Sequence, residues 1–316
     1  MGISAYLKDI GRGAQGARPL SRAQAADLLG QVLDGQCTDL EVGAFCVAMR
    51  IKGETPEEMA GFLDAVHARL PLLDSATHHP VVVLPSYNGA RKQPVLTPLL
   101  ALLLARKGLP VLVHGTPTED ARVTSAQVLA AMGLPVHDVR APLQGGSVHA
   151  VPTEALLPGL KRLLDVRRTI GLRGPAHSLV KLMNPVRGPA LVVGSYTHPE
   201  YAQTMTDTFT RLGAHAMLLR GTEGEPVADA RRIPAMDVFL HGVPTRVQQA
   251  QAGPLDRLPM LPERIDADTT AAYALAVMQG LLPAPEPLMR QVEHIVRACK
   301  AIVAEGDSSC LATLNA

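Results

Sequence analysis

Apolar residues recur at helical spacing through the first seventy or so residues, and no β-rich run interrupts them. Ser21 is placed to cap a helix that ends at Gly35, and Asp39 is placed to cap a second helix. Residues 55–58, Thr-Pro-Glu-Glu, supply a cap, a first-turn proline and two acids for a third helix. The core face of that third helix consists of Met59, Phe62, Leu63 and Val66. This part of the chain is therefore predicted to be an all-helical unit.

After Leu73, short β-branched and apolar runs alternate with helical patterns. The expected strands are 81–84, 110–113, 191–193, 216–219 and 238–240. The expected helices are 96–107, 125–132, 201–212, 268–281 and 286–304. Such alternation is typical of an α/β domain with a central sheet and helices on its faces. The composition of residues 220–262, rich in Pro, Gly and polar residues, predicts long loops.

The overall composition excludes several classes of protein. The 316 residues allow two domains, and an apolar fraction of 47% excludes an intrinsically disordered chain. Because 30 basic residues face 29 acidic ones, the chain is not a histone-like polycation. An aromatic content of 3% argues against a binding face built on many stacked bases.

Targeting signals and cysteines point to a cytoplasmic protein that has no membrane partner. The first residues lack an apolar core followed by a cleavage site, so a signal peptide is not expected. The longest apolar run, residues 96–105, is far shorter than the roughly 20 residues that a membrane span needs. The 4 cysteines lack metal-site spacing and are too few for a disulfide scaffold.

Charge is distributed unevenly along the chain. Residues 161–190 contain a single acid, Asp165, and carry a net charge of +6, against −5 for the remaining chain. The basic residues of this segment are Lys161, Arg162, Arg167, Arg168, Arg173, Lys181 and Arg187. Two interpretations are open: a solvated helix face, or a surface that faces an anionic partner.

Two loops follow predicted strands and carry candidate anion ligands. Sheets of parallel strands bind their ligands at the carboxyl ends of the strands. In the loop 85–93, a turn signal precedes Arg91 and Lys92, and the loop 114–122 ends at Arg122. These three cations could together hold a phosphate, or they could simply be solvated beside an ordinary turn.

Other candidate groups have weaker support. His114 could act as a general base, but no carboxylate is placed to orient it, so a structural or anion-facing role is favoured. The loop 220–225 contains Glu223 and Glu225, which we expect to be exposed acids rather than metal ligands. No catalytic triad order, P-loop or dinucleotide fingerprint occurs.

Several segments resemble the nucleoside phosphorylase/anthranilate phosphoribosyltransferase family. Residues 43–58 resemble its helical domain, and residues 114–133 resemble its second phosphate-side loop and helix. Residues 171–173 and 184–185 resemble its aromatic-acid-binding stretch. The resemblance implies a helical domain, residues 1–74 completed by helices from about 155–187, beside a large α/β domain, residues 75–316. It also implies a homodimer formed through the helical domain.

The catalytic motifs of that family are not matched. Its Gly-Thr-Gly-Gly-Asp loop corresponds to Pro-Ser-Tyr-Asn-Gly at residues 85–89, where proline removes a donor and side chains add bulk. Its Asn-Arg after His-Gly corresponds to Thr116-Pro117, and its magnesium-binding Asp-Glu pair corresponds to Pro226-Val227. We therefore expect no catalytic residues, metal or cofactor. The expected vestigial cleft comprises Tyr87, Asn88, Gly89, His114, Gly115, Arg122, Arg173 and Asn184.

Residues 85–93, 96–100, 195–201 and 220–225 more closely resemble the YbiB-type branch of this family. That resemblance implies a non-enzymatic homodimer that binds DNA and RNA through phosphates with little sequence preference. The expected contact residues are Arg91, Lys92 and the seven cations of residues 161–190. The alternative is an anthranilate-type phosphoribosyltransferase that uses phosphoribosyl pyrophosphate and Mg²⁺, with Arg173 pairing with the carboxylate of the aromatic acid.

Overall fold

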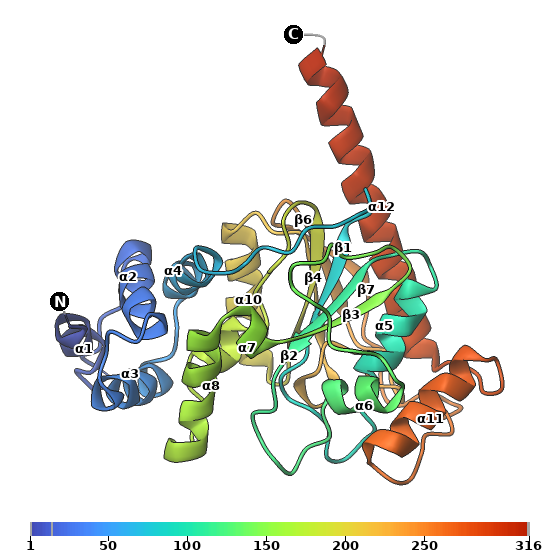
Figure 1. Ribbon diagram of the computed structural model, residues 1–316, viewed down its shortest axis with the longest axis horizontal. Coiled ribbons are helices and arrows are strands. Elements are labelled where there is room, and N and C mark those ends of the chain that lie inside the picture. The colour runs from blue at the N-terminus through green and yellow to red at the C-terminus, as the bar shows by residue number, and fades with distance from the viewer. Residues whose placement is uncertain (1, 14, 315–316) are drawn as a thin grey trace.

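The computed structural model describes residues 2–13 and 15–314, and it places a bundle of helices beside an α/β domain (Figure 1). The bundle begins with α1 (Ser4–Ile10), α2 (Arg22–Leu33), α3 (Asp39–Lys52) and α4 (Pro56–His67). Its core includes Phe45 and Phe62, whose rings meet edge to face with centroids 5.9 Å apart. The predicted all-helical start of the chain is confirmed.

Capping boxes fix where α2, α3 and α4 begin. In each, the cap side chain accepts a hydrogen bond from the third helical N–H, and the third side chain bonds back to the cap. The caps of α2 and α4 are Ser21 and Thr55, as predicted. The prediction for α3 was one residue too late, because Thr38 is the cap and Asp39 is the first helical residue. Only Thr38 has an acid, Glu41, three residues ahead to close the box.

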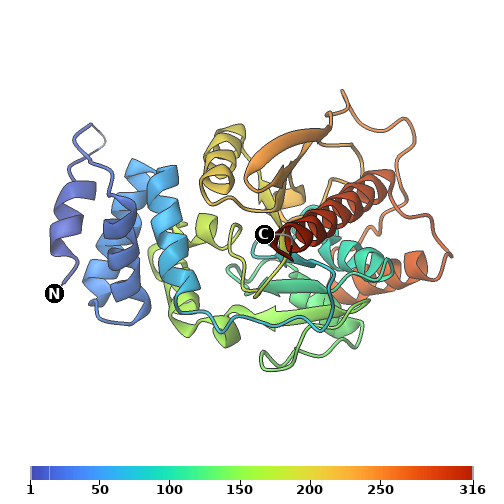
Figure 2. The same ribbon diagram turned by 90° about the horizontal axis from the view of Figure 1, so that it is seen from above.

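Three helices from the middle of the chain join the bundle to the α/β domain. They are α7 (Thr153–Leu156), α8 (Pro158–Ile170) and α9 (Ala176–Leu179). α8 packs against α2 and α3, and α9 packs against α4. A Cβ at Gly159 would lie 2.1 Å from the carbonyl oxygen of Leu33, so α8 approaches α2 as closely as only glycine allows. Both ribbon views show α8 between the bundle and the sheet (Figures 1 and 2).

A seven-stranded sheet forms the centre of the α/β domain, with the order β3-β2-β1-β4-β5-β6-β7. The first five strands in the chain are parallel to one another, whereas β6 pairs antiparallel to β5 and β7 pairs antiparallel to β6. The strands are β1 (Val81–Pro85), β2 (Val111–Gly115), β3 (Val148–Pro152), β4 (Ala190–Tyr196), β5 (Ala216–Arg220), β6 (Met236–Leu240) and β7 (Val243–Gln248). β3 and β7 were not predicted, because they are partly exposed edge strands without a continuous apolar run.

Helices cover both faces of the sheet. One face carries α5 (Thr97–Ala105), α6 (Ser125–Ala131), α11 (Ala267–Met278) and α12 (Glu286–Leu314), and the other carries α10 (Pro199–Arg211) and the bundle. The alternation of β1 divides its side chains between the two cores, with Val82 and Leu84 toward α5 and Val81 and Val83 toward the bundle. α12 runs ten residues beyond the predicted helix end at 304 and projects past the sheet (Figure 1).

The order of the strands locates a crevice. From β1 the chain moves outward to β2 and β3, whereas β4 lies on the other side of β1 and leads to β5. The carboxyl ends of β1 and β4 therefore flank the switch point at which open α/β sheets bind ligands. The predicted α/β fold with a helical domain is confirmed. Within the described residues, no helix combines the length and the apolar character needed to cross a bilayer.

Candidate functional site

The carboxylate of Glu225 is buried inside the loop that follows β1. The residue is 1% exposed, and its Oε1 accepts hydrogen bonds from the backbone N–H groups of Asn88 and Gly89, both at 2.8 Å. Its Oε2 accepts hydrogen bonds from the hydroxyls of Ser86 at 2.5 Å and Thr97 at 3.0 Å. Convergent backbone N–H groups of this kind form the nests in which proteins bind anions. The anion here is supplied by the chain itself.

A second carboxylate, that of Glu223, fills a neighbouring set of donors. Its Oε1 accepts hydrogen bonds from the backbone N–H groups of Arg91 at 3.1 Å, Lys92 at 2.8 Å and Gln93 at 3.1 Å. The guanidinium of Arg122 lies 3.3 Å from its Oε2. Two successive stretches of the loop after β1 therefore each close around one glutamate of the loop after β5.

The loop that carries both glutamates is seated by close backbone packing. A 3₁₀ turn, η1 (Thr222–Gly224), holds Glu223 at a φ of 51°, in the left-handed region that side chains disfavour. The next residue, Gly224, has a φ of +88°, and a Cβ there would lie 2.0 Å from Nδ2 of Asn88. That Nδ2 donates a hydrogen bond to the carbonyl oxygen of Glu223 at 2.8 Å. The hydrogen bonds to the loop after β1 offset the backbone strain at Glu223.

A buried polar chain lies beneath the loop after β1. The hydroxyl of Tyr87 is 2.8 Å from Nδ1 of His114 and accepts a hydrogen bond from Thr153 Oγ1 at 3.0 Å. Burial lowers the pKa of His114 to about 3, so its imidazole is neutral at pH 7. His114 is thus a packing residue hydrogen-bonded to tyrosine, as favoured from the sequence, rather than a base facing the crevice. A Cβ at Gly115 would lie 1.9 Å from the carbonyl oxygen of Ser86, so the ends of β1 and β2 require glycine there.

A cavity of about 240 Å³ lies between the bundle and the carboxyl end of β4. Arg173, His177 and Lys181 line it at four-residue intervals, with Arg50, Tyr196 and Tyr201. Burial, with the charges of Arg173 and Arg167, lowers the pKa of His177 to about 4. The ammonium of Lys181 donates to the carbonyl oxygen of Gly224 at 3.0 Å, and burial lowers its pKa to about 8. The cavity thus combines cations with aromatic rings.

Four of the seven cations of residues 161–190 are paired with acids. The ion pairs are Lys161–Asp165, Arg167–Glu119 at 3.1 Å, Arg168–Asp120 at 2.7 Å and Arg187–Asp74 at 3.0 Å. The guanidinium of Arg162 donates to the carbonyl oxygen of Leu33 at 3.2 Å. Three of the partner acids lie outside this segment of the sequence, so the net +6 is partly neutralised in the folded chain. The net charge of a segment therefore overstates the positive charge of its surface.

The remaining predicted residues lie in several different places. The side chains of Arg91 and Lys92 are exposed at the outside of the loop after β1. Arg122 lies inside, where its Nε donates to Glu119 at 2.8 Å. Asn184 lies apart from these residues, because its Oδ1 accepts the backbone N–H of Val186 at 3.1 Å in a turn beside the bundle. The fold brings the other vestigial-cleft residues together around the ends of β1 and β2, apart from Arg173, which lines the adjacent cavity.

The expectation that Glu225 is an exposed acid is wrong, because the residue is fully buried. Sequence reasoning also missed His177, Arg50 and Tyr196 as cavity residues. A loop carboxylate leaves no periodic signal, and its donors lie up to 139 residues away in the chain. The only local hint was the pair of glycines, Gly221 and Gly224, on either side of Glu223.

The chain matches known proteins in both of its parts. Residues 4–69 match the helical bundle domain of the glycosyl transferase family. Together with the α/β domain, this match defines a protein of the anthranilate phosphoribosyltransferase-like class, and the chain belongs to that family. Within it, the chain is 36% identical to the uncharacterized protein YbiB of Escherichia coli (strain K12), over 96% of this chain and 95% of that protein.

Anthranilate phosphoribosyltransferases are more distant relatives. The chain is 30% identical to that of Idiomarina loihiensis, over 75% of this chain and 68% of the enzyme. Among solved structures, the anthranilate phosphoribosyltransferase of Thermus thermophilus superimposes with a TM-score of 0.69 at 20% identity, covering 96% of this chain and 97% of the enzyme. The Saccharomyces cerevisiae enzyme in complex with PRPP and Mg gives 0.67 at 13% identity, covering 95% and 89%. At these identities the two structures establish the shared fold.

Proposed function

We propose that this chain binds DNA and RNA through their phosphates, with little sequence preference, and that it does not catalyse phosphoribosyl transfer. The observation that carries the proposal is the loop after β1. Its backbone N–H groups are turned inward and bound by Glu223 and Glu225, while the side chains of Arg91 and Lys92 are exposed on its outer side. The loop thus has no free cradle for a small phosphate but presents cations to a large polyanion.

The basic segment 161–190 can add to this surface where its ion pairs are weak. Arg168 and Asp120 are 40% and 84% exposed, and such surface pairs contribute at most about 1 kcal/mol. A nucleic-acid phosphate can therefore replace Asp120 as the partner of Arg168 at little cost. Arg167 is less accessible, because it is 17% exposed and shares Glu119 with Arg122.

The donor set of the crevice does not fit Mg²⁺. Mg²⁺ is bound by carboxylates together with water and substrate phosphates. Here Glu223 and Glu225 face N–H groups, hydroxyls and the Arg122 guanidinium, which leave no coordinating geometry for a cation. No cluster of three or more His, Cys, Asp or Glu suited to a metal occurs within the described residues. Loss of the phosphoribosyl reaction is consistent with this donor set.

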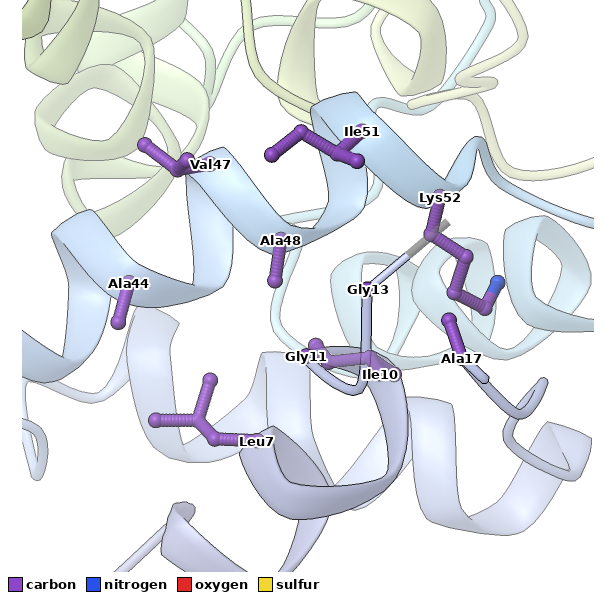
Figure 3. Close-up of a pocket in the computed structure, with 10 residues that line it drawn as sticks. All are labelled: Leu7, Ile10, Gly11, Gly13, Ala17, Ala44, Val47, Ala48, Ile51 and Lys52. Atoms are coloured by element: carbon purple, nitrogen blue, oxygen red, sulfur yellow. The ribbon is translucent and has the colours of Figure 1, made fainter. Parts of the chain in front are cut away.

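We propose that two copies of the chain associate through the helical bundle. One face of α3 carries Leu40 and Ile51, which are 84% and 62% exposed, and Val47 between them. Figure 3 shows Val47 and Ile51 above an apolar groove that α3 forms with Leu7 and Ile10 of α1. Covering this face would remove apolar surface from water. A dimer would also place two cationic surfaces on one polyanion and raise its affinity.

We also propose that the protein acts in the cytoplasm. Cys37, Cys46 and Cys299 are free thiols, and burial raises the pKa of Cys46 to about 11. Inert, reduced thiols are typical of reducing compartments.

An enzymatic alternative is supported by the cavity beside β4. Its cations and tyrosines could accept an aromatic acid, with Arg173 pairing with the carboxylate. The reaction would be followed by anthranilate fluorescence with phosphoribosyl pyrophosphate and Mg²⁺. Steady turnover would establish the alternative.

Fluorescence anisotropy tests the favoured function. A labelled duplex is titrated with protein at about 50 mM and about 200 mM salt. The logarithm of the affinity should fall with the logarithm of the salt concentration, with a slope of about −0.9 for each phosphate neutralised. Absence of binding at the lower salt would contradict the proposal.

A further inference from the structure

We infer that Glu223 and Glu225 are built-in occupants of two anion-binding nests, and that the chain excludes phosphate and pyrophosphate from its crevice by filling these nests with its own carboxylates. The inference concerns the inner side of the loop after β1. It does not depend on nucleic-acid binding, which we assign to the outer side of that loop.

The inner nest has the donor chemistry of a phosphate site. Two consecutive backbone N–H groups, those of Asn88 and Gly89, bind one oxygen of Glu225 at 2.8 Å, and three hydroxyls bind the other. Gly89 has a φ of +63°, a conformation that lets successive N–H groups point to the same side. These donors would lose their acceptor if the carboxylate were absent.

The outer nest repeats the arrangement around Glu223. Three consecutive N–H groups, those of residues 91–93, converge on its Oε1, and Arg122 adds a full positive charge. A consecutive run of three N–H groups with an arginine is suited to a multivalent oxyanion. The carboxylates of Glu223 and Glu225 are thus bound as two phosphate groups would be.

Positive charge beside the nests would lose part of its balancing negative charge without the glutamates. The ammonium of Lys181 donates to the carbonyl oxygen of Gly224, and the charge of Glu225 favours its protonated form. Arg122 pairs with both Glu119 and Glu223. Removing a glutamate side chain therefore leaves a space whose donors and cations favour a dissolved anion as its new occupant.

The loop that carries Glu223 and Glu225 packs too closely against the loop after β1 for a weakly binding anion to displace the two carboxylates. A Cβ at Gly224 would lie 2.0 Å from Nδ2 of Asn88, so the two loops are in close contact, and a Cβ at Gly221 would lie 1.9 Å from the carbonyl oxygen of Glu225, so the loop after β5 is itself tightly packed. A phosphate ion entering either nest would have to separate these loops and expel the carboxylate that fills that nest. The unmodified chain is therefore expected to ignore phosphate at millimolar concentration.

Thermal unfolding of the full chain with inorganic phosphate or pyrophosphate tests the inference. Glu225→Ala opens the inner nest, Glu223→Ala opens the outer one, and ionic strength is held constant with chloride. We expect the melting midpoint of each variant to rise by on the order of 5 °C when the anion reaches about 100 times its dissociation constant. The unmodified chain should not respond.

Two control variants distinguish the opening of a nest from a general change in charge or composition. Glu225→Gln fills the same volume without charge and should stay unresponsive, because its side chain still occupies the nest. Glu293→Ala removes an exposed acid of α12 and reports the effect of net charge alone. Folded Glu223→Ala and Glu225→Ala variants that ignore both anions would overturn the inference, as would an unmodified chain that responds as they do.

If Glu225→Ala does not fold, the inference is tested by refolding that variant with and without pyrophosphate. Refolding of that variant in pyrophosphate, but not in chloride, would support the inference. If pyrophosphate does not restore folding and Glu223→Ala also ignores the anion, the inference is wrong. Anisotropy with labelled DNA on the same variants distinguishes this result from the proposed function, because removing these inward-facing acids should not weaken DNA binding.

Discussion

The hydroxyl of Ser86 donates a hydrogen bond to the buried carboxylate of Glu225 at 2.5 Å, although 139 residues separate them in the chain. This bond joins the end of β1 to the loop after β5. It belongs to the set of donors that holds a charged group inside the protein, where an unpaired carboxylate would be very unfavourable.

Replacing Ser86 with alanine should destabilise the chain. The substitution removes one donor from a buried carboxylate and leaves the others in place, so the free energy of unfolding should fall by about 1–3 kcal/mol. Urea unfolding followed by circular dichroism gives the value. Ser4→Ala, at an exposed position of α1, is the control and should change little. Equal effects of the two substitutions would show that the bond adds nothing to stability.

Replacing Lys92 with alanine should weaken nucleic-acid binding. The side chain is exposed beside the crevice, so its loss removes a phosphate contact and makes the salt slope shallower by about one unit. Lys107→Ala is a matched control, because Lys107 is also exposed but lies before β2, at the opposite end of the strands. Anisotropy with duplexes of unrelated sequence should show that Lys92→Ala loses the same affinity for every duplex. A loss confined to one sequence would argue for base readout instead.

Replacing Asp120 with asparagine should strengthen binding. Asp120 pairs with Arg168 at 2.7 Å and is 84% exposed, so its removal frees a cation and lowers the local negative charge. We expect a severalfold gain in affinity at low salt that disappears at high salt. Asp138→Asn, which breaks the exposed pair with Arg140, is the control for total charge. Identical gains in both variants would mean that Arg168 makes no phosphate contact.

Lys181 should make the stability of the chain depend on alkaline pH. Burial lowers its pKa from 10.5 in the unfolded chain to about 8 in the folded chain. Between these values the unfolded chain binds more protons, so the contribution of Lys181 to stability increases as the pH rises from about 8 to 10.5, and it is lost as the pH falls through about 8. The difference in urea midpoint between the unmodified chain and Lys181→Met should therefore grow in favour of lysine over this range. A difference that is independent of pH would contradict the lowered pKa.

Replacing Ile51 with glutamate should dissociate the proposed dimer. The residue is 62% exposed on the apolar face of α3, so a charge there harms the interface more than the fold. Sedimentation of the unmodified chain should give twice the mass of the variant at micromolar concentration. Leu281→Glu introduces the same charge at another exposed apolar position and should leave the mass unchanged. A monomeric unmodified chain would remove the basis for this prediction.

Local sequence patterns predicted many helix starts and the central strands. Caps such as Ser21 and Thr55 act over three residues, so they can be identified without knowledge of the fold. Edge strand β7 was missed because four of its residues are exposed and no apolar alternation marks it. The resemblance of short motifs to a known family supplied the domain arrangement that periodicity alone leaves open.

The amino-acid sequence by itself determined the α/β fold, the helical bundle and the presence of Arg91 and Lys92 after the first strand. Only the tertiary structure decided where charge is free and where it is neutralised. Arg167 meets Glu119 across 48 residues, and Glu225 enters a nest formed by residues 86–97. Helices and strands arise from short-range periodicity and capping, whereas the partners of a charge are set by the packing of distant segments. The net charge of residues 161–190 could therefore be counted from the sequence, but the surface that it leaves exposed could not.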